Sequence, residues 1–307
     1  MLANPMDILH QFPVRKSKKQ KQEFRDAVQS YCEGLGYGVS VEKGSFNAHN
    51  VVIGDPKTAK YLVTAHYDTC ARLPFPNLIT PCNLIPFILY QLFQVAYIFL
   101  GALIPGVALS LLTGDPELGG LVSYILVWLL LAMMLLGPAN KHNSNDNTSG
   151  VVTLLEIARI MPENQRHKVC FVLFDLEEAG LIGSASYHKA HKKETEHQVI
   201  LNLDCVGDGD EIVFFPTKKL RKDGQKLAWL YKTIGRYGDK SIDVREKGFA
   251  FYPSDQTQFP YGVGIAAFHR SKWAGLYLSR IHTPKDTVLE ETNVNILRAA
   301  LITLISQ

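Results

Sequence analysis

Two apolar stretches without charged side chains constrain this 307-residue chain more than any other feature. No Asp, Glu, Lys or Arg occurs at 73–114 or at 118–140, and a short polar segment, TGDPELGG at 113–120, lies between the two stretches. Residues 84–112 are long enough, at about 1.5 Å per helical residue, to cross a hydrocarbon core about 30 Å thick. Residues 121–136 are fewer but almost wholly apolar. The chain must therefore place two apolar helices against lipid or inside a large core.

We interpret the two stretches as a helical hairpin inserted in the bilayer, with both ends on the same side. A helix without a polar face has to be lipid-facing or buried on all sides, so an apolar lid or a buried helical pair in a soluble domain is the alternative. Pro86 and Pro105 are expected to kink or delimit the first helix. The connecting loop carries two acidic residues and no basic one, whereas Arg72 precedes the hairpin and Lys141 follows it. The positive-inside bias then places the rest of the chain on the cytoplasmic side of the cell membrane.

Composition leaves room for a sizeable core and excludes some classes of protein. With 47% hydrophobic and 20% charged residues and a net charge of +3, the chain has no basic, aromatic-rich stripe that would indicate a nucleic-acid partner. Its five cysteines form no CxxC pair, which is typical of reduced thiols in the cytosol. The N-terminal segment 1–22 does not have the pattern of a secretory signal peptide. A basic run at 15–21 is expected to lie in water or to touch anionic lipid.

Outside the hairpin, apolar strands alternate with helical patterns. This alternation predicts a three-layer αβα sandwich with a mostly parallel central sheet, interrupted by the hairpin. The resulting division is 1–72 and 141–307 for the two parts of one α/β domain, and 73–140 for the insert. The strands are expected near 37–41, 50–53, 61–64, 167–176, 199–203, 212–215, 241–244 and 263–268, and the helices near 24–35, 148–161, 177–191, 225–234 and 292–305.

The apolar strand at 61–64 leads into a first candidate site. It ends in His66, Tyr67 and Asp68, where an open α/β sheet has its ligand crevice. His66 offers an imidazole nitrogen to a metal, and Asp68 is well placed to hold the other ring nitrogen. Taken alone the pair is weak evidence, since a histidine at a strand end is more often a polar residue satisfied by hydrogen bonds.

Further acidic residues and one histidine occur where other apolar strands stop or just after them: Asp146, Glu177, Glu178, Asp204 and His282. Histidines and carboxylates without a thiolate suit Zn²⁺, with Mn²⁺ or Co²⁺ as possible substitutes. If one carboxylate bridges, the set is large enough for two metals about 3.5 to 4 Å apart. One of the adjacent glutamates could then bind metal while the other stays free as a base.

Each of these residues also has an ordinary structural interpretation. Glu177 and Glu178 could form an acidic first turn that complements a helix dipole. Asp146 and Asp204 could belong to polar turns, and His282 could be a lone surface histidine. The recurrence of such residues at the ends of apolar strands favours the site.

The candidate residues belong to six short motifs. The motifs are HYD at 66–68, DNTSG at 146–150, EEAGLIGS at 177–184, NLDCVGDGD at 202–210, SDQTQF at 254–259 and HTPKDT at 282–287. In this order they resemble the di-zinc exopeptidase family that contains aminopeptidase Y and the bacterial leucyl aminopeptidases, a family of zinc-dependent metallopeptidases. The resemblance covers nearly the whole chain except the hairpin.

The resemblance implies a role for each candidate residue. It implies a peptide hydrolase that removes N-terminal residues, with a water held at the two metals as the nucleophile. The implied roles are His66 and Asp204 on one zinc, Glu178 and His282 on the other, Asp146 as the bridge, Glu177 as the general base and Asp68 as the residue that orients His66.

The chain departs from the family pattern in two places. The hairpin occupies a connection that is usually a short loop, and Gln256 stands where the family often has histidine, which puts the details of substrate recognition in doubt. The main hypothesis is a membrane-anchored zinc aminopeptidase with a peptide substrate. One alternative is a glutaminyl-cyclase-like acyltransferase, against which Asn147 after the bridging residue argues. The other is a catalytically silent binding or scaffold protein of the same fold.

Overall fold

A central strand, β3 (Tyr61–His66), organises the body of the molecule. All six of its residues are buried. A strand that is covered on both faces is expected to have a nearly continuous apolar sequence, as this one does. In the computed structural model, which describes residues 2–307, β3 pairs in parallel with β4 (Val169–Phe174) on one side and with β5 (Val199–Leu203) on the other.

The ten-stranded sheet has the order β1-β2-β4-β3-β5-β9-β6-β8-β7, and β10 pairs with β9. Its four central strands, β4, β3, β5 and β9, run parallel, whereas most pairs toward the edges are antiparallel. This confirms the predicted α/β fold with a mostly parallel central sheet. The remaining strands are β1 (Val39–Lys43), β2 (His49–Ile53), β6 (Glu211–Pro216), β7 (Gly235–Tyr237), β8 (Lys240–Val244), β9 (Gly262–Ser271) and β10 (Gly275–Tyr277).

Helices cover both faces of this sheet. On one face, α2 (Lys18–Gly34), α5 (Gly150–Ile160) and α10 (Glu291–Ser306) bury apolar side chains against the strands in one large cluster. On the other face, α6 (Ile182–Ala190) contributes Tyr187 to a smaller cluster. The short helices are α1 (Ile8–Gln11), α7 (Lys192–Thr195), α8 (Lys218–Lys222) and α9 (Gly224–Leu230).

From the sequence we expected the basic run at 15–21 to lie in water or to touch lipid. Two of its residues are buried instead. Arg15 is fully buried and donates from Nε to the Tyr67 carbonyl oxygen at 2.6 Å. Lys21 is also buried, with its Nζ 2.5 Å from Asp175 Oδ1. The expectation was wrong for these two residues because distant polar groups at the ends of β3 and β4 pair with them.

The two apolar stretches form α3 (Leu84–Thr113) and α4 (Pro116–Leu136). The second helix begins earlier than position 121, because the Asp115 side chain caps it by accepting from the amides of Glu117 and Leu118. Pro105 lies inside α3 without ending it, and Pro86 lies in its first turn, where a missing N–H costs nothing.

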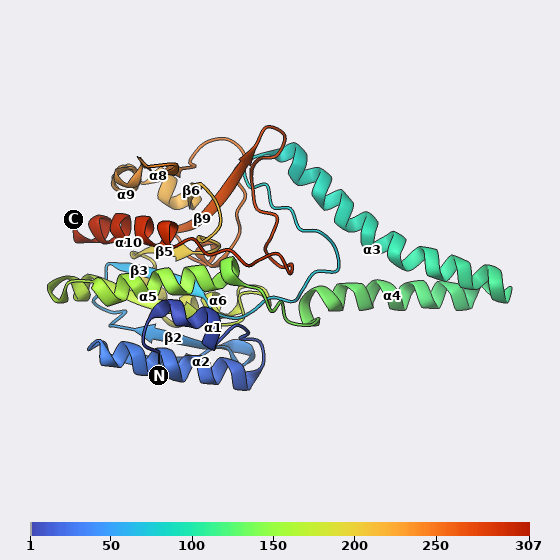
Figure 1. The fold of residues 1–307 in the computed structure, drawn as a ribbon, viewed down its shortest axis with the longest axis horizontal. Coiled ribbons are helices and arrows are strands. Elements are labelled where there is room, and N and C mark those ends of the chain that lie inside the picture. Colours follow the sequence, from blue (N-terminus) through green and yellow to red (C-terminus); the bar gives the residue numbers. More distant parts are fainter. Residues whose placement is uncertain (1) are drawn as a thin grey trace.

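The hairpin projects away from the body as a V whose helices converge toward their connecting loop (Figure 1). Near that loop, Gly106 and Gly119 meet, since a Cβ at either position would lie within 2.5 Å of the other's carbonyl oxygen. Small residues allow such close approach of membrane helices. Only 17% and 6% of the most apolar windows of α3 and α4 are buried. The alternative of a helical pair buried in the core is therefore wrong.

Candidate metal centre

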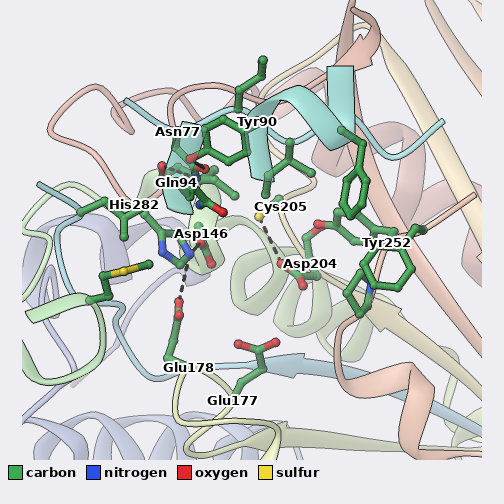
Figure 2. Close-up of a pocket in the computed structure, with 18 of the residues that line it drawn as sticks. Asn77, Tyr90, Gln94, Asp146, Glu177, Glu178, Asp204, Cys205, Tyr252 and His282 are labelled. Carbon is green, nitrogen blue, oxygen red and sulfur yellow. Dashed lines mark hydrogen bonds and ion pairs between the residues drawn. The ribbon is translucent and has the colours of Figure 1, made fainter. Parts of the chain in front are cut away.

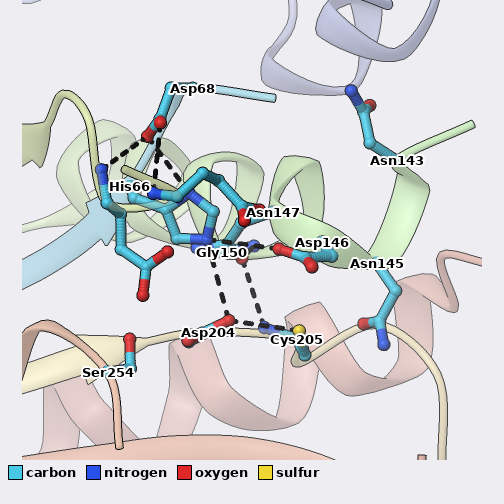
Figure 3. Close-up of polar contacts among 12 residues, drawn as sticks. His66, Asp68, Asn143, Asn145, Asp146, Asn147, Gly150, Asp204, Cys205 and Ser254 are labelled. Carbon is cyan, nitrogen blue, oxygen red and sulfur yellow. Dashed lines mark hydrogen bonds and ion pairs between the residues drawn. The ribbon is translucent and has the colours of Figure 1, made fainter. Parts of the chain in front are cut away.

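His66 ends β3 with its two ring nitrogens facing different carboxylates (Figure 3). Nε2 lies 3.2 Å from Asp146 Oδ1 and 3.8 Å from Asp204 Oδ1, whereas Nδ1 lies 3.5 Å from Asp68 Oδ1. The side chain is buried. One edge of the ring thus points into a group of acidic residues while Asp68 lies against the other edge.

Asp68 also holds the loop that carries the two glutamates. Its carboxylate accepts the backbone N–H of Glu177 at 3.1 Å and that of Glu178 at 3.3 Å. Because α6 begins only at Ile182, the glutamates lie in the β4–α6 loop. The interpretation of the pair as an acidic first helical turn is therefore wrong.

Asp146 lies between the two histidines. Its Oδ1 faces His66, and its Oδ2 is 2.9 Å from His282 Nε2. The backbone that presents it is fixed by Asp286, whose carboxylate accepts the amides of Asn145 and Asp146 at 2.8 and 3.0 Å. The Asp146–Asn147 peptide bond is cis. Asp146 therefore has one oxygen on each side of the cluster.

The candidate ligands fall into three overlapping groups, and within each group the atoms lie within 4.8 Å of one another. His66, Asp146 and Asp204 form the first group, and His66, Glu177 and Glu178 form the second. Cys70, Asp146, Glu178 and His282 form the third, in which His282 Nε2 is 3.6 Å from Glu178 Oε1 (Figure 2). The structure thus brings all the predicted site residues together, although the sequence analysis did not foresee Cys70 beside them.

The donor set fits bound cations. Glu178 Oε1 is buried without a hydrogen-bond partner, which is costly unless an ion or water satisfies it. Burial raises the pKa of Glu178 to about 8; the charge of His282 opposes this shift and that of Asp146 adds to it. Burial likewise raises the pKa of Glu177 well above its usual range. A cation among these groups would relieve the crowding of like charges.

A pocket of about 410 Å³ opens over these residues. Its floor is the carboxylate and histidine cluster, and its upper wall comes from the hairpin (Figure 2). Tyr90 and Gln94 reach it from the first turns of α3, and Met134 reaches it from the last turn of α4. The pocket therefore connects the candidate metal centre to the base of the hairpin.

Three acidic or amide residues in the quoted motifs have surroundings that the sequence did not reveal. Asp286 supports the backbone at Asp146, and its position in HTPKDT was the only signal for it. Asp255 is fully buried, and neither carboxylate oxygen has a hydrogen-bond partner; burial raises its pKa to about 7. Gln256 donates to the Tyr252 carbonyl oxygen and accepts from Asn202, so its amide is engaged within the fold.

Comparison with known proteins places these motifs in a family. Residues 137–304, more than half of the chain, match the profile of Peptidase family M28. A segment of 67 residues, 21% of this chain, is 40% identical to aminopeptidase YwaD of Bacillus subtilis. That match covers 15% of the relative's length, so the chain spans only a small part of this curated relative.

Solved structures show the same fold at low sequence identity. A Zn-dependent exopeptidase from Parabacteroides distasonis aligns with a TM-score of 0.61 at 15% identity, covering 96% of this chain and 92% of that one. A glutaminyl cyclase from Porphyromonas gingivalis aligns with a TM-score of 0.62 at 16% identity, covering 96% and 93%. A peptidase and a cyclase are thus equally similar in fold, and function has to be argued from the site.

Proposed function

This chain belongs to peptidase family M28, and we propose that it is a membrane-anchored, two-zinc aminopeptidase that removes N-terminal residues from peptides. The observation that carries the proposal is the position of Asp146, whose two oxygens face His66 and His282 at 3.2 and 2.9 Å. A carboxylate with one oxygen toward each of two histidines is suited to bridge two metals.

In this proposal the seven residues take the roles that the family resemblance implies. His66 and Asp204 hold one zinc, Glu178 and His282 hold the other, and Asp146 is shared. Two zinc ions bound there would lower the pKa of a water between them and polarise the scissile carbonyl.

Glu177 is the proposed general base. It accepts the proton of the attacking water and passes it to the leaving amine, a task that needs a carboxylate held at the site but free of metal. Asp68 is a positioning residue, because its carboxylate contacts both the His66 ring and the Glu177 amide. It therefore fixes the base relative to the metal ligand.

The hairpin is the proposed membrane anchor, with the α/β domain on the cytoplasmic side. Both helices are long and apolar enough to span a bilayer and are mostly uncovered by protein. At the base of the hairpin, Lys16 Nζ donates to the Leu135 carbonyl oxygen at 3.4 Å, and Arg72 and Lys141 flank the hairpin in the sequence. The tip of the hairpin carries Asp115 and Glu117 instead, in agreement with the positive-inside bias.

Hydrolysis of a panel of aminoacyl amides by detergent-purified protein tests the proposal, with zinc content measured on the same sample. We expect activity with about two zinc per chain, and a loss of about 10²-fold or more in Glu177→Gln, which should keep its metal. One metal with cyclisation of N-terminal glutamine would favour the acyltransferase instead. Neither metal nor turnover would favour the silent scaffold.

A further inference from the structure

Helix α3 has two different faces where it passes the pocket. Phe87, Gln91 and Gln94 line the pocket together with Met134 of α4. On other sides of the same turns, Ile85 and Leu92 are 69% and 59% exposed. The wall between the candidate metal centre and the apolar exterior is therefore a single helix thick.

With the hairpin inserted as proposed, the lengths of its two helices place this wall at the edge of the bilayer. At about 1.5 Å per residue, the 21 residues of α4 span roughly 31 Å, close to the hydrocarbon thickness of about 30 Å. The 30 residues of α3 span roughly 45 Å, so α3 must tilt or extend beyond the hydrocarbon. Met134 lies at the end of α4, so the pocket opens at the membrane interface.

The pocket lining combines a polar and an apolar part. Carboxylates and histidines form its floor, and Tyr90, which also lines the pocket, donates to Asn77 Oδ1 at 2.9 Å. Phe87 and Met134 of the hairpin, together with the half-exposed Phe251, add apolar side chains to the lining. A ligand that fits has a polar end at the floor and an apolar end toward the hairpin.

We propose that the pocket takes amphiphilic aminoacyl amides from the membrane interface. This inference rests on the proposed aminopeptidase function and names its substrate class. The aminoacyl group lies at the metal centre, and the apolar chain on the leaving amine runs past Phe87 and Met134 toward the bilayer. Water adds across the amide: the C–N bond breaks, a C–O bond forms, and the amine departs with the proton that Glu177 transfers.

Leucyl-butylamide and leucyl-dodecylamide, which share one scissile bond, test this class of substrate on the full-length zinc-loaded protein in vesicles. The quantity compared is the ratio of kcat/KM for the dodecylamide to kcat/KM for the butylamide. We expect this ratio to be at least about tenfold higher than for a soluble aminopeptidase in the same vesicles, because each additional methylene buried against the wall adds to binding. The soluble enzyme corrects for partitioning of the substrate into lipid.

Wall variants assign the preference to the pocket. Phe87→Ala and Met134→Ala should lower the dodecyl-to-butyl ratio severalfold, whereas the neighbouring variants Ile88→Ala and Leu135→Ala should leave it unchanged, because those side chains are 46% and 48% exposed on the exterior. Zinc content, measured for every variant, reports an intact site.

Two results would overturn the inference. Turnover of both amides with the ratio of the soluble enzyme, or with a ratio unaffected by the wall variants, would refute the substrate class and leave the aminopeptidase proposal standing. Turnover of neither amide by zinc-loaded protein would refute both.

Discussion

At the scale of single residues, the site contains carboxylates that accept backbone amides as well as carboxylates that face the two histidines. Asp68 accepts the amides of both glutamates, and Asp286 accepts the amides of Asn145 and Asp146. Residues with positive φ occur beside them, since Leu176, which precedes Glu177, has φ 56° and His282 has φ 59°. Such unfavourable backbone conformations cluster at functional sites, where surrounding contacts hold them.

Replacing Asp286 tests this support. Asp286→Asn keeps the size of the side chain but replaces one acceptor oxygen with an NH₂ donor, so the backbone at Asp146 loses a hydrogen bond. We expect zinc affinity to fall about 10- to 100-fold, as is usual for partners of metal ligands. Competition with a chelator measures the affinity. Asp239→Asn, at an exposed turn, is the matched control, and equal affinities in the two variants would contradict the role of Asp286.

At the scale of elements, two buried contacts hold pairs of elements together. Lys21 joins α2 to Asp175, which directly follows β4, and both side chains are nearly inaccessible. Gly106 and Gly119 join α3 to α4 through direct backbone contact. The Lys21–Asp175 contact depends on charge, whereas the Gly106–Gly119 contact depends on the absence of side chains. Each can be tested by a separate substitution.

Lys21→Met should leave the Asp175 carboxylate buried without its counter-charge. Removal of one partner of a buried ion pair typically costs about 3 to 5 kcal/mol. We expect a loss of that order in the free energy of unfolding measured in detergent. Lys19→Met removes an 85% exposed lysine from the same helix and should cost less than about 0.5 kcal/mol. Similar losses in the two variants would argue against the ion pair.

Gly106→Val should force α3 and α4 apart, because a Cβ at this position would lie 1.9 Å from Ser123 Oγ and 2.5 Å from the Gly119 carbonyl oxygen. Overpacking of this kind costs about 1 to 3 kcal/mol, which thermal unfolding in detergent can detect. At Gly120, in α4, an added Cβ would meet no atom within 4 Å. Gly120→Val should therefore be nearly neutral, and a Gly106 variant as stable as this control would contradict the close packing.

At the scale of the whole molecule, the hairpin and the body present different surfaces. The body buries its apolar residues in the clusters on either side of the sheet, whereas α3 and α4 expose theirs, with Leu111 and Leu112 more than 80% exposed. Exposed apolar area of this extent marks an interaction surface for a membrane or for another protein. The proposed topology places only the tip of the hairpin, 113–117, on the far side of the membrane.

Thiol labelling in intact cells tests that topology. In a Cys82→Ser background the other native cysteines are buried, so an introduced cysteine can be read separately. We expect Glu117→Cys, near the tip, to react with an impermeant maleimide added outside, and Asp239→Cys, on the body, to react only after permeabilisation. The reverse pattern would place the catalytic domain outside, and labelling of both in intact cells would rule out a spanning hairpin.

The sequence predicts the parts of this architecture that depend on local patterns. Continuous apolar runs located the central strands, and the predicted 199–203 matches β5 at both ends. The three-residue strands β7 and β10 were missed, because segments so short show no period. The burial of Arg15 and Lys21 was missed as well, since a basic run reveals no partner and Lys21 meets an aspartate 154 residues away. The support from Asp286 could not be predicted for the same reason.

The contact between Gly106 and Gly119 also acts as a pivot between the two helices, and this pivot lies near the tip of the hairpin, far from the pocket at its base. Sixteen residues of α3 separate Gly106 from Tyr90, a lever arm of about 24 Å. A rotation of about 10° at the pivot would displace Tyr90 by roughly 4 Å at the pocket. A change in the angle between α3 and α4 would therefore alter the width of the opening above the candidate metal centre.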